Sequence, residues 1–106
     1  FNKKIIRNKK YKDFFDIITI WTVLEHIPNI NIFIKNLNFI LKKKGKILIH
    51  VPNVESLSAR ILHEKCSTFA GHQHINHFSI ETLKCSINNE DFSSLRSYNI
   101  YCNIGE

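Results

Sequence analysis

The chain has 106 residues, of which 43% are hydrophobic and 23% charged, a composition typical of one folded globular domain. This balance excludes an intrinsically disordered polyelectrolyte and a collagen-like repeat. The formal net charge is +6, and many of the lysines fall in two clusters, within residues 3–12 and 42–46. Charge blocks usually decorate a solvated surface, and no helix-turn-helix, zinc-finger or aromatic stacking pattern accompanies these clusters, so we expect no nucleic-acid partner.

Two further features concern the compartment and the limits of the chain. No apolar run approaches the roughly 20 residues needed to cross a bilayer, so we expect no membrane span. The cysteines Cys66, Cys85 and Cys102 lie far apart and form no C-x-x-C pair, which favours reduced thiols in a cytoplasmic protein. The chain contains no methionine and begins with Phe1, and we interpret it as a piece of a longer protein.

The first two predicted elements are a strand and a helix. Residues 14–20 are apolar almost without interruption and rich in β-branched and aromatic side chains, as is typical of a strand buried on both faces of a parallel sheet. Apolar side chains then recur at helical spacing and predict a helix over residues 30–41. Lys42 to Lys44 are expected in its last turn, where the helix dipole favours cations, and Gly45 at the position that ends it.

A second apolar strand, residues 46–51, follows this helix. Strand, helix and strand make one βαβ unit with a right-handed crossover, so the two strands are expected to run parallel. The fold class is therefore α/β. Within this unit, the residues expected to be mostly buried are Ile17, Ile20, Leu37, Ile47 and Ile49.

Further elements are predicted downstream. Asn53 is expected to begin a second helix and Ser79 to cap a third. The apolar residues that share a face are Val54, Leu57 and Ile61 in the second helix, and Ile80, Leu83 and Ile87 in the third. Residues 92–102 alternate in polarity and are predicted to form a final strand near a sheet edge.

The topology also predicts where a site would lie, because ligands of open α/β sheets bind beyond the carboxyl ends of the strands. Residues 21–26 directly follow the first strand, and Pro52 and Asn53 follow the second. Glu25 and His26 are adjacent ionisable residues on such a loop and are the best candidates for acid–base chemistry. The simpler interpretation is that they cap the following helix and stay solvated.

Five motifs of the chain resemble the class I S-adenosylmethionine-dependent methyltransferases. In chain order, they are Phe15-Asp16-Ile17-Ile18, Val23-Leu24-Glu25-His26-Ile27-Pro28, Leu41 to Lys46, Ile49-His50-Val51-Pro52-Asn53, and His74-Ile75-Asn76-His77-Phe78-Ser79 with Thr82-Leu83. The last is similar to a segment of the ubiquinone-methyltransferase-like branch. Their order and spacing over residues 13–92 match the second half of the family's domain. Residues 1–106 are accordingly identified as the C-terminal portion of one such domain, with no second domain.

This resemblance implies a partial Rossmann-like sheet whose N-terminal half is missing. It also implies methyl transfer from S-adenosylmethionine to a small-molecule acceptor, at a hydroxyl group or a carbon, such as on a phenol or a sugar. Trp21 and Thr22 would lie against the cofactor. His26 would act as the catalytic base near the methyl-transfer centre, and Glu25 would orient it or the substrate. The family's glycine-rich loop and its acidic ribose contact have no counterpart in this chain, so the fragment alone is expected to be inactive.

The resemblance also implies which residues meet the acceptor and whether a metal takes part. His74 and His77 would bind the acceptor or hold their loop in shape, with Asn53 at the same sheet edge. His72, His74 and His77 lack the helical spacing or the added ligands of a typical zinc site. Thr22 stands where ubiquinone-type enzymes carry an additional acid of a divalent-metal site. We therefore expect no metal.

The alternative to an enzyme is a non-catalytic fragment or pseudoenzyme that serves as a binding or assembly module through its basic face. The sequence upstream of this chain discriminates between the two hypotheses. A strand followed by a glycine-rich loop there indicates an enzyme, and its absence indicates a module.

Overall fold

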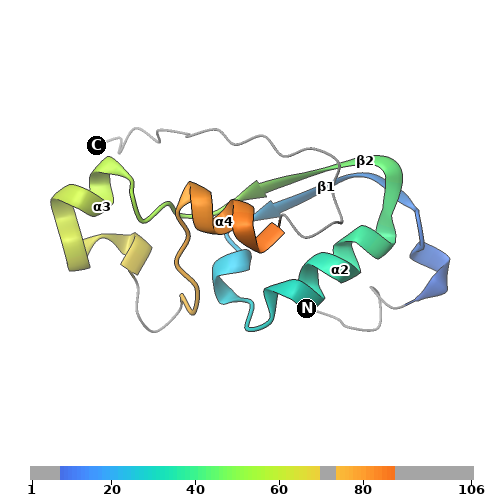
Figure 1. The fold of residues 1–106 in the computed structure, drawn as a ribbon, viewed down its shortest axis with the longest axis horizontal. Coiled ribbons are helices and arrows are strands. Elements are labelled where there is room, and N and C mark those ends of the chain that lie inside the picture. Colours follow the sequence, from blue (N-terminus) through green and yellow to red (C-terminus); the bar gives the residue numbers. More distant parts are fainter. Residues whose placement is uncertain (1–7, 70–73, 88–106) are drawn as a thin grey trace.

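The computed structural model describes residues 8–69 and 74–87 (Figure 1). Short 3₁₀ turns are labelled η. In chain order, the elements are η1 (Lys9–Tyr11), β1 (Phe15–Trp21), η2 (Leu24–His26), α2 (Ile30–Ile40), β2 (Leu41–His50), α3 (Leu57–Leu62), η3 (His63–Lys65), η4 (Ser67–Phe69) and α4 (Ile80–Ile87). No helix within the described ranges is long and apolar enough to cross a membrane. The predicted final strand, residues 92–102, and His72 lie outside the described residues.

β1 and β2 pair in parallel, which confirms the predicted arrangement of the two strands (Figure 1). Ile17 pairs with Lys46 and Trp21 with His50, so the strands end side by side at their carboxyl ends. The register shifts between Phe15 and Ile17, near the start of the pairing. The loops that follow the two strands are therefore brought to one end of the molecule.

The chain passes from α2 into β2 without an intervening turn. α2 ends at Ile40, and Leu41 already has an extended backbone with φ −79° and ψ 135°. The prediction that the helix includes Leu41, carries residues 42–44 in its last turn and stops at Gly45 is therefore wrong. Leu41 is buried and pairs with Phe15 in the sheet. Burial of a leucine side chain outweighs the few tenths of a kcal/mol that lysines gain from the helix dipole.

Gly45 has a role in packing rather than in ending a helix. It does not have a positive φ. A Cβ atom added there would lie 2.7 Å from both Cγ and Cδ1 of Leu41 and 3.0 Å from the carbonyl oxygen of Lys42. The residue is a glycine because the chain passes directly over the buried Leu41 side chain.

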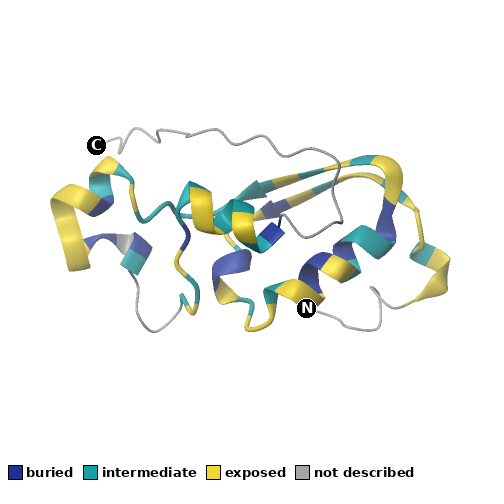
Figure 2. Ribbon diagram, viewed as in Figure 1, coloured by how far each residue is buried: buried dark blue, intermediate teal, exposed yellow. Residues whose placement is uncertain are grey.

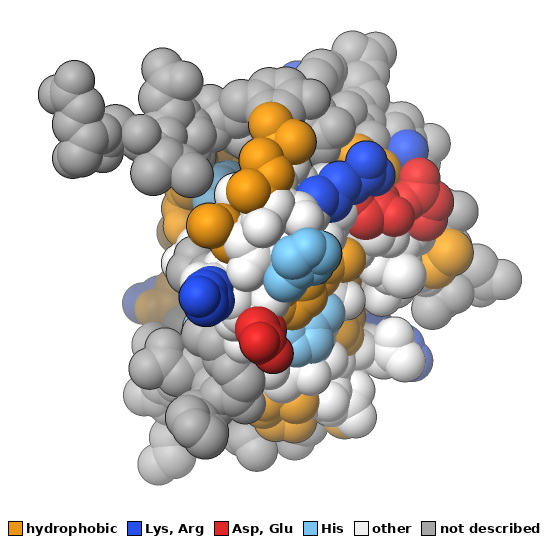
Figure 3. Space-filling model, turned by 90° about the vertical axis from the view of Figure 1, so that its left-hand side faces the viewer, with side chains coloured by type: hydrophobic (Ala, Val, Ile, Leu, Met, Phe, Trp, Pro, Cys, Tyr) orange, Lys and Arg blue, Asp and Glu red, His pale blue; other side chains and the backbone are white. Residues whose placement is uncertain are grey.

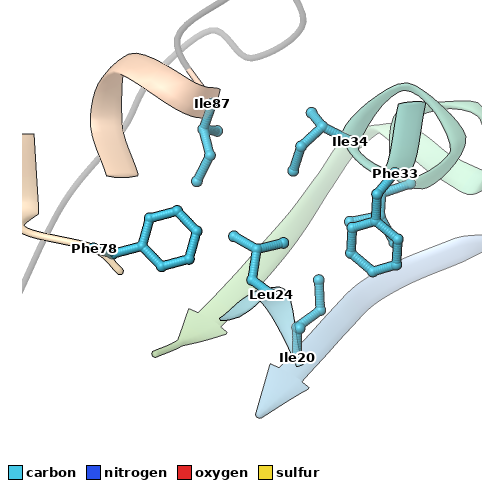
Figure 4. Close-up of a cluster of buried hydrophobic side chains, with 7 residues drawn as sticks. Ile20, Leu24, Phe33, Ile34, Phe78 and Ile87 are labelled. Atoms are coloured by element: carbon cyan, nitrogen blue, oxygen red, sulfur yellow. The ribbon is translucent and has the colours of Figure 1, made fainter. Parts of the chain in front are cut away.

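One hydrophobic cluster joins the sheet to the turn that follows β1 and to two helices (Figure 4). Its members are Ile20, Leu24, Phe33, Ile34, Leu37, Phe78 and Ile87. Ile20 and Leu37 are buried, which confirms two of the predicted core positions. The buried side of α2 faces the strands, whereas α3 is largely exposed (Figure 2). The centre of the cluster is Leu24, whose exposure is 0%.

The strands are buried less completely than predicted. Ile17 is 65% exposed, so the prediction that it is buried is wrong. Side chains alternate between the two faces of a strand, and Ile18 and Ile20 take the face that packs on the hydrophobic cluster. The helices α2 and α4 contribute to that same cluster, which leaves Ile17 on the opposite face. Ile47 and Ile49 are partly buried and pack against the cluster.

α3 begins later than predicted. Its N-cap is Ser56, whose Oγ accepts a hydrogen bond of 3.2 Å from the backbone N–H of Ala59. Asn53 instead forms an isolated parallel bridge with Phe78, so the prediction that it starts the helix is wrong. The bridge holds Asn53 in an extended segment, and the helix starts at the next side chain able to cap it.

α4 begins as predicted, directly after Ser79. The Ser79 Oγ accepts a hydrogen bond of 3.2 Å from the backbone N–H of Thr82, and the Thr82 Oγ1 accepts one of 2.8 Å from the backbone N–H of Ser79. This reciprocal pair satisfies backbone donors at the start of the helix. Leu83 and Ile87 then face the hydrophobic cluster, as the predicted helical spacing requires.

Candidate functional site

The end of the molecule at which β1 and β2 terminate collects most of the predicted site residues. Figure 3 looks onto this end, and histidine side chains lie near the middle of the face, with hydrophobic and charged side chains around them. The segments after β1, after β2 and before α4 meet here, because the Asn53–Phe78 bridge joins the last two. Ligands of parallel α/β sheets bind at this end.

Glu25, His26 and His74 form a compact cluster at this end. A carboxylate oxygen of Glu25 and a ring nitrogen from each histidine all lie within 4.8 Å of one another. The Nε2 of His26 is 3.9 Å from the Oε1 of Glu25. The rings of His26 and His74 meet edge to face, with centroids 5.0 Å apart. The structure thus joins the predicted acid–base pair to one of the predicted acceptor-binding histidines.

Glu25 is the unusual member of this cluster. It is 1% exposed, and neither carboxylate oxygen has a hydrogen-bond partner. Its burial follows from its neighbour, since Leu24 anchors the turn η2 in the hydrophobic cluster. Burying a carboxylate without hydrogen bonds is costly, and the cost is offset when a positive charge lies nearby. The imidazoles of His26 and His74 can supply that charge by protonation or by holding a cation.

His74 is oriented from its other side by Thr68. Its Nδ1 lies 3.0 Å from the carbonyl oxygen of Thr68. A carbonyl only accepts, so Nδ1 donates, and in the neutral ring the lone pair is on Nε2. Thr68 is itself held by a contact of 3.3 Å between its Oγ1 and the Sγ of Cys66. Hydrogen bonding with Thr68 lowers the pKa of the buried Cys66 thiol.

Trp21 and Thr22 lie beside His50, at the ends of the two strands. Trp21 is 54% exposed and stacks on the His50 ring, with centroids 5.3 Å apart and planes inclined by 30°. The backbone N–H of Thr22 donates to the His50 carbonyl at 2.9 Å. Thr22 has φ 48°, which is strained for a β-branched residue and is most common at functional sites.

His77 and Asn53 are placed differently from His74. His77 is exposed, and its ring contacts Phe69 with centroids 5.8 Å apart. Asn53 bridges to Phe78, and the next N–H, of Val54, donates to the Phe78 carbonyl at 3.0 Å. A shallow hollow nearby is lined by Val54, Ala59, Arg60, His63, Glu64 and Phe69. His77 and Asn53 therefore flank this hollow rather than the Glu25 cluster.

Three residues that shape the site were not among the predicted ones. His50 stacks on Trp21 and supports it. The sequence held a signal for this pair, because aligning the carboxyl ends of the two predicted parallel strands places Trp21 beside His50. Thr68 orients His74, and Asn76 forms hydrogen bonds to the turn that carries Glu25. The last two contacts depend on the path of a loop, for which the sequence holds no periodic signal.

The cluster also has the chemistry of a small cation site. One carboxylate oxygen and two imidazole nitrogens are a donor set that suits zinc, iron and other divalent transition metals. This donor set is not the group of three histidines, His72, His74 and His77, considered as a zinc site from the sequence. The two groups share only His74. The Glu25 carboxylate, which is buried and has no hydrogen-bond partner, is the structural observation that fits a cation here.

The profile of one protein family, described as a methyltransferase domain, matches residues 2–94. Searches of curated proteins and of solved structures gave no significant match. The matched range includes both strands, the turn that carries Glu25 and His26, and the loop that carries His74. The chain therefore belongs to the methyltransferase domain family.

Proposed function

We propose that this chain is the C-terminal portion of a class I methyltransferase domain of the ubiquinone-methyltransferase-like branch. The proposed reaction transfers a methyl group from S-adenosylmethionine to a hydroxyl group, or a carbon, of a small molecule such as a phenol or a sugar. The observation that carries this proposal is the buried, unpartnered Glu25 carboxylate beside His26 and His74 at the carboxyl end of β1. Membership of the family supports methyl transfer as the reaction.

His26 is the proposed base. S-adenosylmethionine, when bound, supplies a methyl group activated by its sulfonium. For an oxygen acceptor, the chain must then remove the hydroxyl proton and hold the oxygen in line. The His26 side chain is 41% exposed, which makes it accessible to an acceptor. The imidazolium formed would lie 3.9 Å from the buried Glu25 carboxylate, whose negative charge stabilises it.

Trp21 and Thr22 are proposed to bind the cofactor. An exposed indole face attracts a cation within about 6 Å of its centroid, and a sulfonium is such a cation. His50 stacks against Trp21 and limits the orientations of its ring. The positive φ of Thr22 supports this assignment, since strained backbone is commonly retained at ligand sites.

His74, His77 and Asn53 are proposed to contact the acceptor. His74 lies against the base, whereas His77 and Asn53 flank the hollow lined in part by Phe69 and Val54. An acceptor that reaches from this hollow to His26 would contact all three residues. The hollow is shallow, which suits an acceptor of which one part remains in solvent.

A divalent cation is the competing source of positive charge for the same cluster. Glu25, His26 and His74 would hold it, and it would lower the pKa of an acceptor hydroxyl bound to it. Such a cation would occupy the lone pair with which His26 accepts a proton. The two roles of His26 therefore exclude each other, and we propose the metal-free reaction.

Cofactor binding tests the proposal that the chain is one portion of a larger domain. The first glycine in the chain is Gly45, so the family's glycine-rich loop has no counterpart ahead of β1. We expect S-adenosylhomocysteine titrated calorimetrically into the 106-residue chain to show no measurable binding. The complete protein, in contrast, is expected to bind one equivalent. Micromolar binding by the chain alone would show that the Trp21 face suffices, and a complete protein that does not bind would refute methyl transfer.

A further inference from the structure

The loop before α4 is attached to the turn η2 through the backbone. The N–H groups of Ile75 and Asn76 both donate to the carbonyl oxygen of Glu25, at 2.8 and 3.0 Å. The backbone of the candidate acid is thus the anchor for the segment that follows His74. The carboxylate of Glu25 therefore belongs to the cluster with His26 and His74, whereas its backbone carbonyl anchors the loop.

The side chain of Asn76 adds a second attachment on either side of this anchor. Its Nδ2 donates to the carbonyl oxygen of Leu24 at 3.2 Å and to that of Ile27 at 2.7 Å. An amide NH₂ has two donors, and here both meet carbonyls at the two ends of the turn that carries Glu25 and His26. The Leu24 carbonyl also accepts a hydrogen bond of 3.2 Å from the Ile27 N–H within the turn. Asn76 therefore adds a second donor to that carbonyl and links it to the carbonyl of the residue that follows η2.

These bonds determine where His74 lies. Its ring is held on one side by the Thr68 carbonyl at 3.0 Å and meets the His26 ring on the other. His74 is two residues from Asn76, so the side-chain hydrogen bonds of Asn76, together with the two backbone bonds to the Glu25 carbonyl, hold this loop on the turn. We propose that Asn76 is a positioning residue that holds His74 against His26 and Glu25. The effect of Asn76 on turnover rests on the proposed function, whereas its effect on the position of His74 does not.

The chemistry of the amide explains why asparagine is needed. Asn76→Asp has the same shape, but an ionised carboxylate only accepts and would repel the carbonyls of Leu24 and Ile27. Asn76→Ala removes both donors, and Asn76→Ser keeps one. Asn31→Ala is the matched control, because Asn31 is exposed on α2.

The test is made in the complete protein with two readouts. The first is nuclear magnetic resonance of the imidazoles, which reports the tautomer of His74 and the contact between the His26 and His74 rings. In Asn76→Ala and Asn76→Asp we expect the ring contact to be lost and His74 to sample both neutral tautomers, whereas Asn31→Ala keeps the parent spectrum. The second readout is methyl transfer, for which kcat should fall roughly 10- to 100-fold while KM for S-adenosylmethionine is unchanged. A purely structural role would instead lower the folded fraction, measured by circular dichroism, and leave kcat per folded molecule unchanged.

The outcomes distinguish this inference from the proposed function. If Asn76→Ala keeps the ring contact and the His74 tautomer, the inference is overturned, regardless of the activity of His26→Ala. If the contact is lost but kcat is unchanged while His26→Ala is inactive, the positioning role is overturned and the proposed function stands. If His26→Ala is itself fully active, the proposed role of His26 as the base fails, and the spectra alone decide the role of Asn76. If the complete protein transfers no methyl group at all, the proposed function fails. Should Asn76→Ala fail to fold, Asn76→Ser must show a partial loss of the contact, and a parent-like spectrum would count against the inference.

Discussion

His26→Ala is expected to lower methyl-transfer turnover by roughly 10²- to 10⁴-fold, the usual contribution of general-base catalysis. The geometry behind this expectation is that the His26 imidazole is accessible and its Nε2 lies 3.9 Å from the Oε1 of the buried Glu25 carboxylate. Cofactor affinity should be nearly unchanged, because Trp21 and Thr22 bind the cofactor in this account. The measurement is kcat in the complete protein, with a weakly acidic alcohol or sugar hydroxyl as acceptor.

The choice of acceptor and two controls make this result interpretable. An acidic phenol needs little proton removal, so only a weakly acidic hydroxyl reports the base. Glu25→Gln should reduce turnover less than His26→Ala, because it removes the stabilising charge and leaves the proton acceptor. Turnover should also survive chelation, whereas a loss that is restored by a divalent cation would assign the cluster to a metal. Full activity of His26→Ala would exclude His26 as the base and make His74 the candidate.

Leu24→Ala is expected to have the largest effect on stability, lowering the free energy of unfolding by about 2–5 kcal/mol. Leu24 is 0% exposed in the hydrophobic cluster, so truncating its side chain leaves a cavity among the buried residues there. Such a loss is a large part of the 5–15 kcal/mol typical of a folded domain. Chemical denaturation monitored by circular dichroism measures it.

The control for this variant is Leu57→Ala, since Leu57 is 64% exposed on α3. It should change stability by no more than about 0.5 kcal/mol. The turn η2 carries both Leu24 and Glu25, so the loss of packing should also lower turnover in molecules that remain folded. A Leu24→Ala protein as stable as the Leu57→Ala protein would show that the hydrophobic cluster is not centred on this turn.

The sequence predicts the βαβ unit well because its signals are local. The apolar run of β1 and the helical spacing of α2 each lie within a short stretch of the sequence. A helix that connects two strands of one sheet then makes those strands parallel. The end of α2 could not be predicted in this way. Leu41 leaves the helix because it is buried and pairs with Phe15, a partner that is distant in the sequence. Ile17 was misplaced because the continuous apolar run of β1 predicts burial on both faces, whereas the described helices pack only on the face of Ile18 and Ile20.

The predictions for the site also succeeded where the signal is local and failed where it depends on distant contacts. Glu25 and His26 could be predicted because they follow a strand whose carboxyl end is the expected position for ligands. Which loop histidine joins them could not, because the Asn76 hydrogen bonds select His74 over His77. The burial of Glu25 could not be predicted either, since it depends on how Leu24 inserts into the hydrophobic cluster.

The central claim is that the carboxyl end of β1 binds S-adenosylmethionine next to the Glu25 cluster. Ultraviolet cross-linking of methyl-tritiated S-adenosylmethionine to the complete protein, followed by peptide mapping, tests it without knowledge of the acceptor. Trypsin releases residues 13–35 as one peptide, which holds Trp21, Thr22, Glu25 and His26. We predict that this peptide carries the label and that excess S-adenosylhomocysteine prevents labelling. Competed label confined to peptides outside residues 13–35 would contradict the account.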